Sequence, residues 1–217
     1  MDEIAELKNL DPIKQQAVLK DLSLRMNLVN LLFHILGFKD LNKVHKDLCD
    51  FMDANHLFKM VLMPRYSFKS TICTIGYSIY RLMKNPDMRI LIYSDASSKA
   101  EAFLSSIKDH IEGKVRGGAF HLLFKWFPNS KNQTWNMSQI VISGRQTSFP
   151  EASVDTGGIE TSKVGKHYDL IIFDDIVSDQ NITTKEQMDK VSDCYKRSLS
   201  LLRPNGEVVV VGCLIGG

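Results

Sequence analysis

The sequence lacks the features that mark membrane, secreted or zinc-stabilised proteins. No apolar run approaches the roughly 20 residues that a transmembrane helix requires, so we expect no membrane partner. The acidic, amphipathic start of the chain is unlike a signal peptide. The four cysteines form no C-x-x-C pair, and the six histidines show no metal-type spacing. These patterns predict reduced thiols in a reducing compartment and no structural metal site.

An excess of charge of one sign is also missing. The 27 Lys and Arg residues are nearly balanced by 25 Asp and Glu residues, which leaves a net charge of +2. This balance neither indicates nor excludes nucleic acid as a partner. With 217 residues, 44% of them hydrophobic and 24% charged, the chain has the composition of a folded globular protein with one substantial core.

The chain contains an alternation of expected strands and helices. Residues 1–54 are expected to be helical, with amphipathic stretches at 11–36 and 40–54. The later strands are expected at 58–63, 88–94, 139–144 paired with 152–158, 168–175 and 207–217, and the later helices at 70–85, 97–113 and 183–202. Ser94 or Asp95 is expected to cap the helix at 97–113, and residues 203–206 are expected to form a turn. This order predicts an α/β fold with a mostly parallel sheet flanked by helices.

A short segment after the first of these strands suggests a phosphate-binding loop. Residues 63–71 read MPRYSFKST, in which a lysine precedes Ser and Thr at the start of a helix. The usual pattern is G-x-x-x-x-G-K-[ST], but Met63 and Phe68 occupy both glycine positions. Phe68 argues against a phosphate site, because a bulky residue must avoid positive φ or accept strain. Taken alone, the segment also fits an ordinary helix start.

A second motif ends the expected strand at 168–175, which reads YDLIIFDD. Paired carboxylates at the carboxyl end of an apolar strand can hold magnesium and orient an attacking water. By themselves, Asp174 and Asp175 also fit an acidic turn. Together with the lysine-containing loop, in this order, they are a more specific indication of a nucleotide site. Both motifs fall at the carboxyl ends of strands, where such sheets bind ligands.

With these motifs, the chain resembles the ATPase domain of a phage terminase large subunit, the motor that packs DNA into procapsids. Residues 56–71 are similar to that family's P-R-x-x-x-K-[ST] form of Walker A, which often lacks the glycines. Residues 90–113, 155–177 and 200–212 resemble its second strand and helix, its Walker B region and the strand before its coupling motif. The resemblance implies a P-loop NTPase core (RecA-like, ASCE) at 55–217, an N-terminal helical lid or subdomain at 1–54, and no C-terminal nuclease domain in this chain.

The resemblance also implies roles for individual residues. The nucleotide-binding residues are Arg65, Tyr66, Ser67, Phe68, Lys69, Ser70 and Thr71. Ser70 and Asp174 bind Mg²⁺, and ATP is the nucleotide. Asp175, where many relatives carry Glu, acts in catalysis with Arg65 and Lys69. The chain departs from the family at Cys213, where a threonine-containing coupling motif is usual, and the cation that reaches a neighbouring subunit is left open among Arg145, Lys163 and Lys166.

The implied function is ATP-driven translocation of double-stranded DNA into a procapsid, in the cytoplasm of an infected host cell. The implied partners are the portal protein, the terminase small subunit and further copies of the chain in a ring, although the isolated chain is expected to be a monomer. Candidate DNA contacts are Lys99, Lys114, Arg116 and Lys125, each of which equally fits a solvated surface. The alternatives are another P-loop DNA-dependent ATPase, helicase-like or from DNA repair, and a nucleotide-binding module without efficient turnover.

Overall fold

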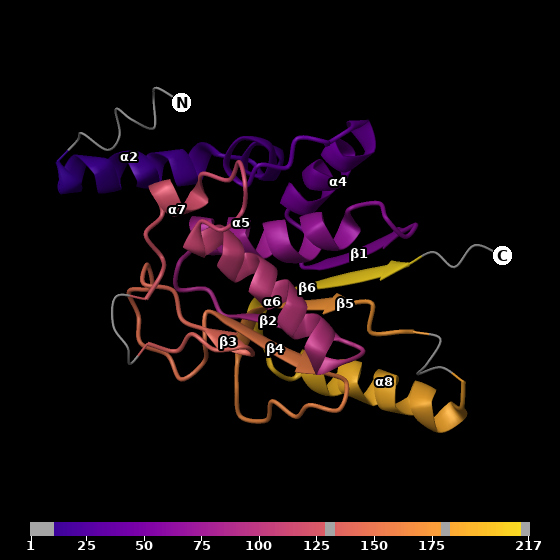
Figure 1. Cartoon of the computed structure of the whole chain (residues 1–217). Coiled ribbons are helices and arrows are strands. Elements are labelled where there is room, and N and C mark those ends of the chain that lie inside the picture. The colour runs from indigo at the N-terminus through magenta and orange to yellow at the C-terminus, as the bar shows by residue number, and fades with distance from the viewer. Residues whose placement is uncertain (1–10, 129–132, 179–182, 214–217) are drawn as a thin grey trace.

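The computed structural model describes residues 11–128, 133–178 and 183–213 and has an α/β architecture (Figure 1). Its sheet has six strands in the order β1-β6-β5-β2-β4-β3. The strands are β1 (Phe58–Met63), β2 (Ile90–Ser94), β3 (Gln139–Ile140), β4 (Val154–Gly158), β5 (Tyr168–Asp174) and β6 (Leu202–Cys213). All neighbours are parallel except β3 and β4. The predicted α/β class with a mostly parallel sheet is therefore confirmed, and this arrangement is compatible with a RecA-like fold.

Helices lie on both faces of this sheet, with α8 on the face opposite α5 (Figure 1). The helices are α2 (Pro12–Arg25), α3 (Leu28–Asn30), η1 (Leu31–Ile35), α4 (Lys43–Asp53), η2 (Thr71–Gly76), α5 (Tyr77–Lys84), α6 (Ser97–Glu112), α7 (Phe120–Leu123) and α8 (Lys185–Leu199), of which η1 and η2 are π-helices. The helices expected at 40–54, 70–85, 97–113 and 183–202 are all present with shifted ends. Gly113, in the left-handed conformation (φ 76°), ends α6.

Two apolar clusters fill the space between the sheet and its helices. The larger cluster joins Leu32 and Met52 of the N-terminal helices to Val61 of β1 and Ile79 of α5. The smaller cluster lies under α8 and includes Phe173 of β5. Strand β5 supplies side chains to both clusters and has a continuous apolar sequence, as expected for a parallel strand buried on both faces.

The amphipathic stretch at 11–36 is not one helix. Helix α2 ends at Arg25, and Asn27 is extended (φ −91°, ψ 168°). The side chain of Asn27 accepts a hydrogen bond from the backbone N–H of Asn30 and so caps α3. Apolar residues continue at helical spacing through the break, which is why the pattern did not reveal it. The expectation for residues 1–10 lies outside the described residues.

The expected cap of α6 is wrong. The residue that precedes this helix is Ala96, which makes no side-chain cap. Ser94 instead donates its hydroxyl to the carbonyl of Asp174, at 2.8 Å. Asp95 pairs with Lys99, with 2.7 Å between carboxylate and ammonium. Ser94 thus contacts the end of β5, and Asp95 contacts the first turn of α6.

The turn expected at 203–206 is also wrong, because these residues lie inside β6. The pairing of β5 with β6 changes register between Tyr168 and Leu170, so the extra residues are absorbed as an irregularity in the strand. Asn205 has φ 62° there, which explains why the local sequence has the composition of a turn.

Within the described residues, no helix combines the length and apolar character that crossing a bilayer requires.

Candidate functional site

A cleft of about 770 Å³ opens at the carboxyl ends of β1, β5 and β6. Its walls include Arg65, Tyr66 and Lys69 from the loop after β1, Asp175 from the end of β5, and Cys213 from the end of β6. The sheet order places β6 between β1 and β5, so these three strand ends are direct neighbours. The cleft therefore lies where parallel sheets commonly bind ligands.

The loop after β1 has two residues in the left-handed region, Tyr66 (φ 64°) and Phe68 (φ 57°). Right-handed and left-handed residues in succession turn backbone N–H groups toward one side and form anion-binding concavities. Glycine usually supplies the left-handed positions. Here Phe68 adopts one despite its size, and its ring packs edge-on against His45 of α4, with 5.5 Å between ring centroids. Of the two outcomes expected for Phe68, avoidance of positive φ or strain, the structure shows the second.

Lys69 extends from this loop into the protein and is 7% exposed. Its Nζ lies 3.0 Å from Cys213 Sγ and 3.3 Å from Asp175 Oδ2. Burial lowers the pKa of Lys69, but the hydrogen bond to Cys213 and the attraction of Asp175 outweigh burial and raise this pKa above its ordinary value. The side chain is therefore a buried ammonium held near the end of β5.

Asp174 is the fully buried last residue of β5. Ser70 donates its hydroxyl to Asp174 Oδ1 at 2.9 Å, and Thr74 donates to Asp174 Oδ2. Burial raises the pKa of Asp174 to about 6, against the opposing effect of the hydrogen bonds from Thr74 and Ser70. A carboxylate that is desolvated and has only hydroxyl donors gains strongly from a nearby cation.

Asp175 has a different environment from Asp174. It follows the strand with φ 47°, and its backbone N–H donates to the carbonyl of Val211 at 2.9 Å. This turn directs its carboxylate toward Lys69, and 35% of the side chain is exposed. One acid is thus buried among hydroxyls and the other borders the cleft beside a cation, so the two are suited to separate roles.

The other predicted loop residues do not all face the cleft, because Phe68 and Thr71 line a separate, smaller pocket beside Gly37. Arg65 is exposed and lines the cleft, and Tyr66 is fully exposed. The hydroxyl of Ser67 donates to the carbonyl of Pro64 at 2.7 Å and so closes the loop on itself. Thr71 is the first residue of η2. The predicted binding residues are therefore all part of one loop and the helix start that follows it.

Sequence reasoning missed Thr74 and Ser94, which both bind Asp174. Thr74 follows Ser70 by four residues, a spacing that places two side chains on one side of a helix. That spacing was the available signal for Thr74. The π-helix η2 widens this turn, a feature often found at functional sites.

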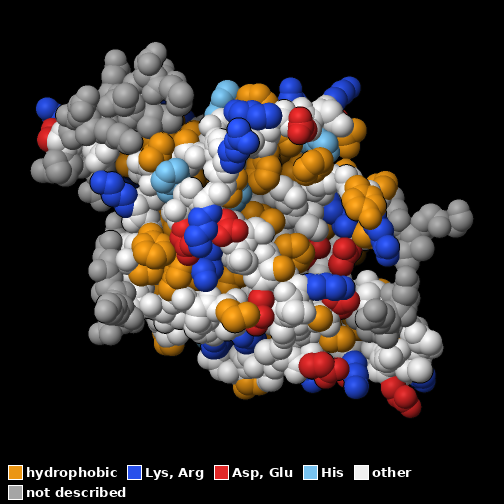
Figure 2. Space-filling model, viewed as in Figure 1, with side chains coloured by type: hydrophobic (Ala, Val, Ile, Leu, Met, Phe, Trp, Pro, Cys, Tyr) orange, Lys and Arg blue, Asp and Glu red, His pale blue; other side chains and the backbone are white. Residues whose placement is uncertain are grey.

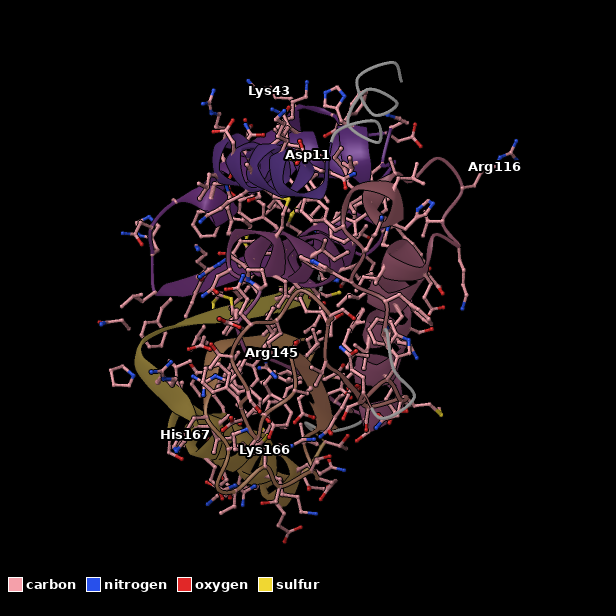
Figure 3. All side chains as sticks on the ribbon, turned by 90° about the vertical axis from the view of Figure 1, so that its left-hand side faces the viewer. Asp11, Lys43, Arg116, Arg145, Lys166 and His167 are labelled. Carbon is pink, nitrogen blue, oxygen red and sulfur yellow. The ribbon has the colours of Figure 1, made fainter. Side chains whose placement is uncertain are left out.

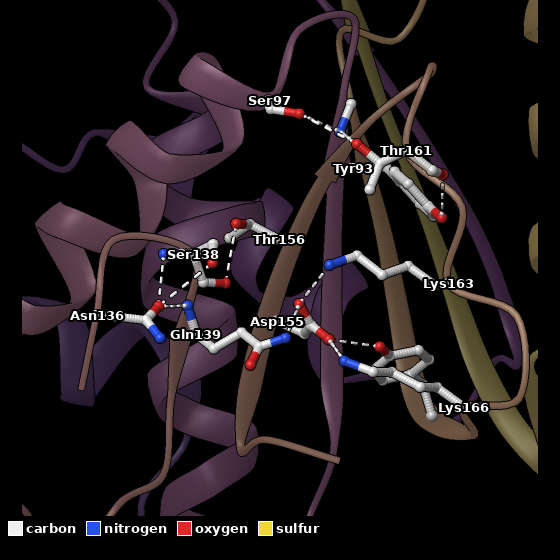
Figure 4. Close-up of polar contacts among 12 residues, drawn as sticks. Tyr93, Ser97, Asn136, Ser138, Gln139, Asp155, Thr156, Thr161, Lys163 and Lys166 are labelled. Carbon is white, nitrogen blue, oxygen red and sulfur yellow. Dashed lines mark hydrogen bonds and ion pairs between the residues drawn. The ribbon is translucent and has the colours of Figure 1, made fainter. Parts of the chain in front are cut away.

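The candidate intersubunit cations are bound to acceptors within the chain. Lys163 and Lys166 each place Nζ 2.7 Å from the carboxylate of the fully buried Asp155, and Tyr168 donates its hydroxyl to the same group (Figure 4). Arg145 donates to the carbonyl of Glu151 at 2.6 Å. Figure 3 shows Arg145 and Lys166 on one side of the molecule. In this conformation each of the three candidates contributes to the internal structure.

The candidate DNA contacts differ in their surroundings. Lys99 pairs with Asp95 and Lys114 pairs with Glu112, whereas Arg116 projects away from the body (Figure 3). Lys125 is exposed. On the face shown in Figure 2, basic and acidic side chains of the described residues are interspersed.

The donors at the cleft fit magnesium bound together with a nucleotide. In the part of the chain that the structure describes, no group of three or more His, Cys, Asp or Glu residues is placed to hold a metal. The available pair is the Ser70 hydroxyl with the Asp174 carboxylate. Magnesium commonly takes one or two protein oxygens and completes its shell with phosphate and water, so this small donor set suits it.

Comparison with known proteins gives no family for this chain: no family model matches it, and no curated protein matches it. Its function is therefore inferred from the loop after β1, the acids at the end of β5 and the cleft between them.

Proposed function

We propose that this chain is an ATP-hydrolysing P-loop domain with a RecA-like core. The observation that carries the proposal is the meeting of its two motifs in one cleft. Ser70 Oγ lies 2.9 Å from Asp174 Oδ1 across 104 residues of sequence, and Lys69 Nζ lies 3.3 Å from Asp175 Oδ2 across 106. If the helix start and the acidic turn were unrelated in function, nothing would require the first to supply a buried lysine and the second a buried carboxylate at the same place.

Binding of the phosphates follows from the loop. Its left-handed residues and the first turn of η2 offer backbone N–H groups to an anion, and the ammonium of Lys69 adds a positive charge close by. Ser70 and Asp174 would hold magnesium, which would supply positive charge to neutralise the phosphates. Because burial disfavours the ionised form of Asp174, a cation at this position restores its charge.

Hydrolysis then requires a group that orients water. Asp175 is the candidate, because its carboxylate borders the cleft while its backbone is anchored to Val211. Lys69 and Arg65 stabilise the charge that develops on the transferred phosphoryl group. These roles leave Asp174 to the metal and Asp175 to the water.

The resemblance of residues 56–212 to terminase large subunits supports a more specific proposal. The chain is the ATPase domain of a DNA-packaging motor in an infected host cell, with double-stranded DNA, a portal protein and a terminase small subunit as partners. In a ring of copies, Arg145, Lys163 or Lys166 reaches the neighbouring site after release from its internal acceptor. Such a release requires a rearrangement when subunits come into contact. For Lys163 or Lys166 the segment between β4 and β5 would move, and for Arg145 the segment that carries it.

One contact favours a second candidate, a nucleotide-binding module without efficient turnover. Lys69 and Asp175 form an ion pair with each other, which occupies both the phosphate-binding lysine and the proposed water-orienting acid. If this pair persists when nucleotide is bound, Asp175 is not available to water. Such a chain binds ATP but releases little phosphate.

Matched substitutions of the two acids test the proposal. Binding of Mg²⁺-ATP is measured by calorimetry, and phosphate release is measured at steady state, for the wild type, Asp174→Asn and Asp175→Asn. Asp174→Asn should weaken both binding and hydrolysis, whereas Asp175→Asn should retain binding and lose about 10²- to 10⁴-fold in kcat. The exposed Asp189→Asn on α8 is the control and should change neither quantity.

Equal and small effects of both substitutions would contradict an ATPase site. Binding by the wild type without phosphate release, unchanged in Asp175→Asn, would instead support the binding module. A rate of phosphate release per subunit that is stimulated by double-stranded DNA and rises with protein concentration would support the motor, since a neighbouring subunit then contributes to each site.

A further inference from the structure

The buried ammonium of Lys69 has a partner that the proposed mechanism does not use. Cys213 Sγ, at 3.0 Å, is nearer to Lys69 Nζ than the carboxylate of Asp175, at 3.3 Å. Cys213 also lies 3.6 Å from Asp175 Oδ2. The three side chains therefore form one cluster, and two of its members have roles in the proposed reaction.

The fold fixes Cys213 in this position. It is the last residue of β6, and it lies opposite Met63, the last residue of β1, in the parallel pairing of the two strands. Because β6 runs between β1 and β5, the end of β6 lies beside both the loop after β1 and the paired acids after β5. Cys213 lines the cleft and is partly exposed, whereas Cys49, Cys73 and Cys194 are buried.

We propose that Cys213 is a positioning residue that holds Lys69 in a resting position, turned toward the ends of β5 and β6, and thereby sets the affinity for nucleotide. This inference rests on the proposed function and deepens it, because it assigns a regulatory contact to the same site. A buried ammonium needs acceptors. Cys213 and Asp175 provide them before nucleotide binds.

The effect on nucleotide affinity depends on whether the contact between Lys69 and Cys213 exists in the nucleotide-free state, in the nucleotide-bound state or in both. Phosphates bound by the loop after β1 attract Lys69 toward the loop, away from the end of β6. The contact to Cys213 is then lost on binding, so it stabilises only the nucleotide-free state. An interaction restricted to the free state lowers the apparent affinity, in the same way as a low population of a binding-competent conformation does. Removal of the sulfur should therefore tighten binding.

The test compares Cys213→Ala with Cys213→Ser. Calorimetry with Mg²⁺-ATP should give a Kd about 3- to 10-fold lower for Cys213→Ala than for the wild type, the range expected for one hydrogen bond of typical strength. The kcat for phosphate release should stay within about twofold, because the contact is absent once nucleotide is bound. Cys213→Ser restores an acceptor and should return the Kd to near the wild-type value. Cys194→Ala, on α8, is the control for loss of a thiol and should leave the Kd unchanged.

Cys213→Val removes the acceptor, leaves no space empty and suits a strand, so it should tighten binding as Cys213→Ala does. It keeps the test decisive if the alanine variant folds poorly, which thermal melting would reveal. Unchanged or weaker binding in the alanine and valine variants would overturn the role of Cys213 while leaving the ATPase proposal intact. Failure of the serine variant to restore the wild-type Kd would also overturn it. Absence of Mg²⁺-ATP binding by the wild type would overturn both proposals together.

Discussion

Buried charges have different partners at the two ends of the parallel strands, namely the amino edge, where β1 begins, and the carboxyl edge, where β1, β5 and β6 end. Near the amino end of β1, Lys59 hydrogen-bonds to Glu207 in the middle of β6, and each residue is only 4% exposed. Glu207 also accepts from Tyr77, at 2.6 Å, and pairs with Arg81. At the carboxyl ends, Asp174 is completely buried but receives hydrogen bonds from hydroxyls alone among its described side-chain contacts.

Backbone conformation differs in degree. Among the described residues, three of the four non-glycine residues with positive φ lie around the cleft, namely Tyr66, Phe68 and Asp175, and the fourth, Asn205, lies in β6 before Glu207. Such conformations store strain and are common at functional sites. The comparison indicates that the amino edge is built for stability, whereas the carboxyl edge keeps a desolvated carboxylate and a strained loop that a ligand can relieve. Substitutions at the two edges should therefore have opposite effects on the stability of the ligand-free protein.

The largest effect is expected from Glu207→Gln at the amino edge. The substitution leaves Lys59 and Arg81 without their carboxylate, and loss of one partner from a buried ion pair typically destabilises by about 3–5 kcal/mol. Urea unfolding measures the change in the free energy of unfolding. Glu160→Gln, at an exposed residue, is the control and should change it by less than about 0.5 kcal/mol. A loss below 1 kcal/mol for Glu207→Gln would contradict the view that this edge carries the stability.

A second prediction concerns His110, an exception within the stable part of the molecule. This residue near the end of α6 is 4% exposed, and its Nδ1 has no hydrogen-bond partner among the described residues. Burial lowers the pKa of His110 from 6.5 to about 4. The unfolded chain therefore takes up this proton at a higher pH than the folded protein does. Stability should fall as the pH drops from about 6.5 to about 4, by about 3 kcal/mol at about 1.4 kcal/mol per pKa unit.

Comparison of variants isolates this contribution. His110→Leu should lose less stability than the wild type over the same pH range, in urea unfolding at pH 7 and pH 4. His56→Gln, at an exposed histidine, should follow the wild-type profile. Parallel profiles for the wild type and His110→Leu would show that His110 does not titrate as its burial requires.

The third prediction brings stability and function together at Asp174. Burial raises the pKa of Asp174 from 3.8 to about 6, so the unfolded chain releases this proton first and stability falls as the pH rises from about 3.8 to about 6. Asp174→Asn removes that loss and should stabilise the ligand-free protein by about 1–3 kcal/mol at pH 8, with little effect at pH 3.5. The proposed function further predicts that Mg²⁺-ATP raises the melting temperature of the wild type and that this increase is lost in the same variant. Destabilisation at pH 8 would mean that Asp174 has a structural role.

The sequence predicted those parts of the fold that depend on local pattern. Apolar strands and amphipathic helices alternate, and this alternation gave the α/β class, the parallel sheet and the meeting of Lys69 with Asp175 at one edge. The break at Asn27 was missed because apolar spacing continues across it. The irregularity of β6 was missed because Asn205 fits a turn equally well until the pairing with β5 is known.

Within the candidate site, the contacts that could be predicted are those of residues that follow a strand directly, such as Lys69 and Ser70. Their roles stay predictions. Ser94 could not be assigned to the site, because its bond to the carbonyl of Asp174 depends on β2 and β5 being neighbours in the sheet. The acceptance of positive φ by Phe68 was also beyond local reasoning, since packing against His45 of α4 accompanies it. In both cases the missing information lies in contacts between distant segments.

The smallest effect is expected at Tyr66, where only backbone strain is tested. The side chain is 100% exposed and the residue has φ 64°, so its ring adds little packing while its Cβ disfavours the conformation. Tyr66→Gly and Tyr66→Ala both remove the ring, but only glycine adopts this φ readily. The glycine variant should therefore be more stable than the alanine variant by about 1 kcal/mol in urea unfolding. Equal stability of the two variants would mean that Tyr66 leaves the left-handed region in solution, and the anion-binding shape inferred for this loop would then have to form only when the phosphates bind.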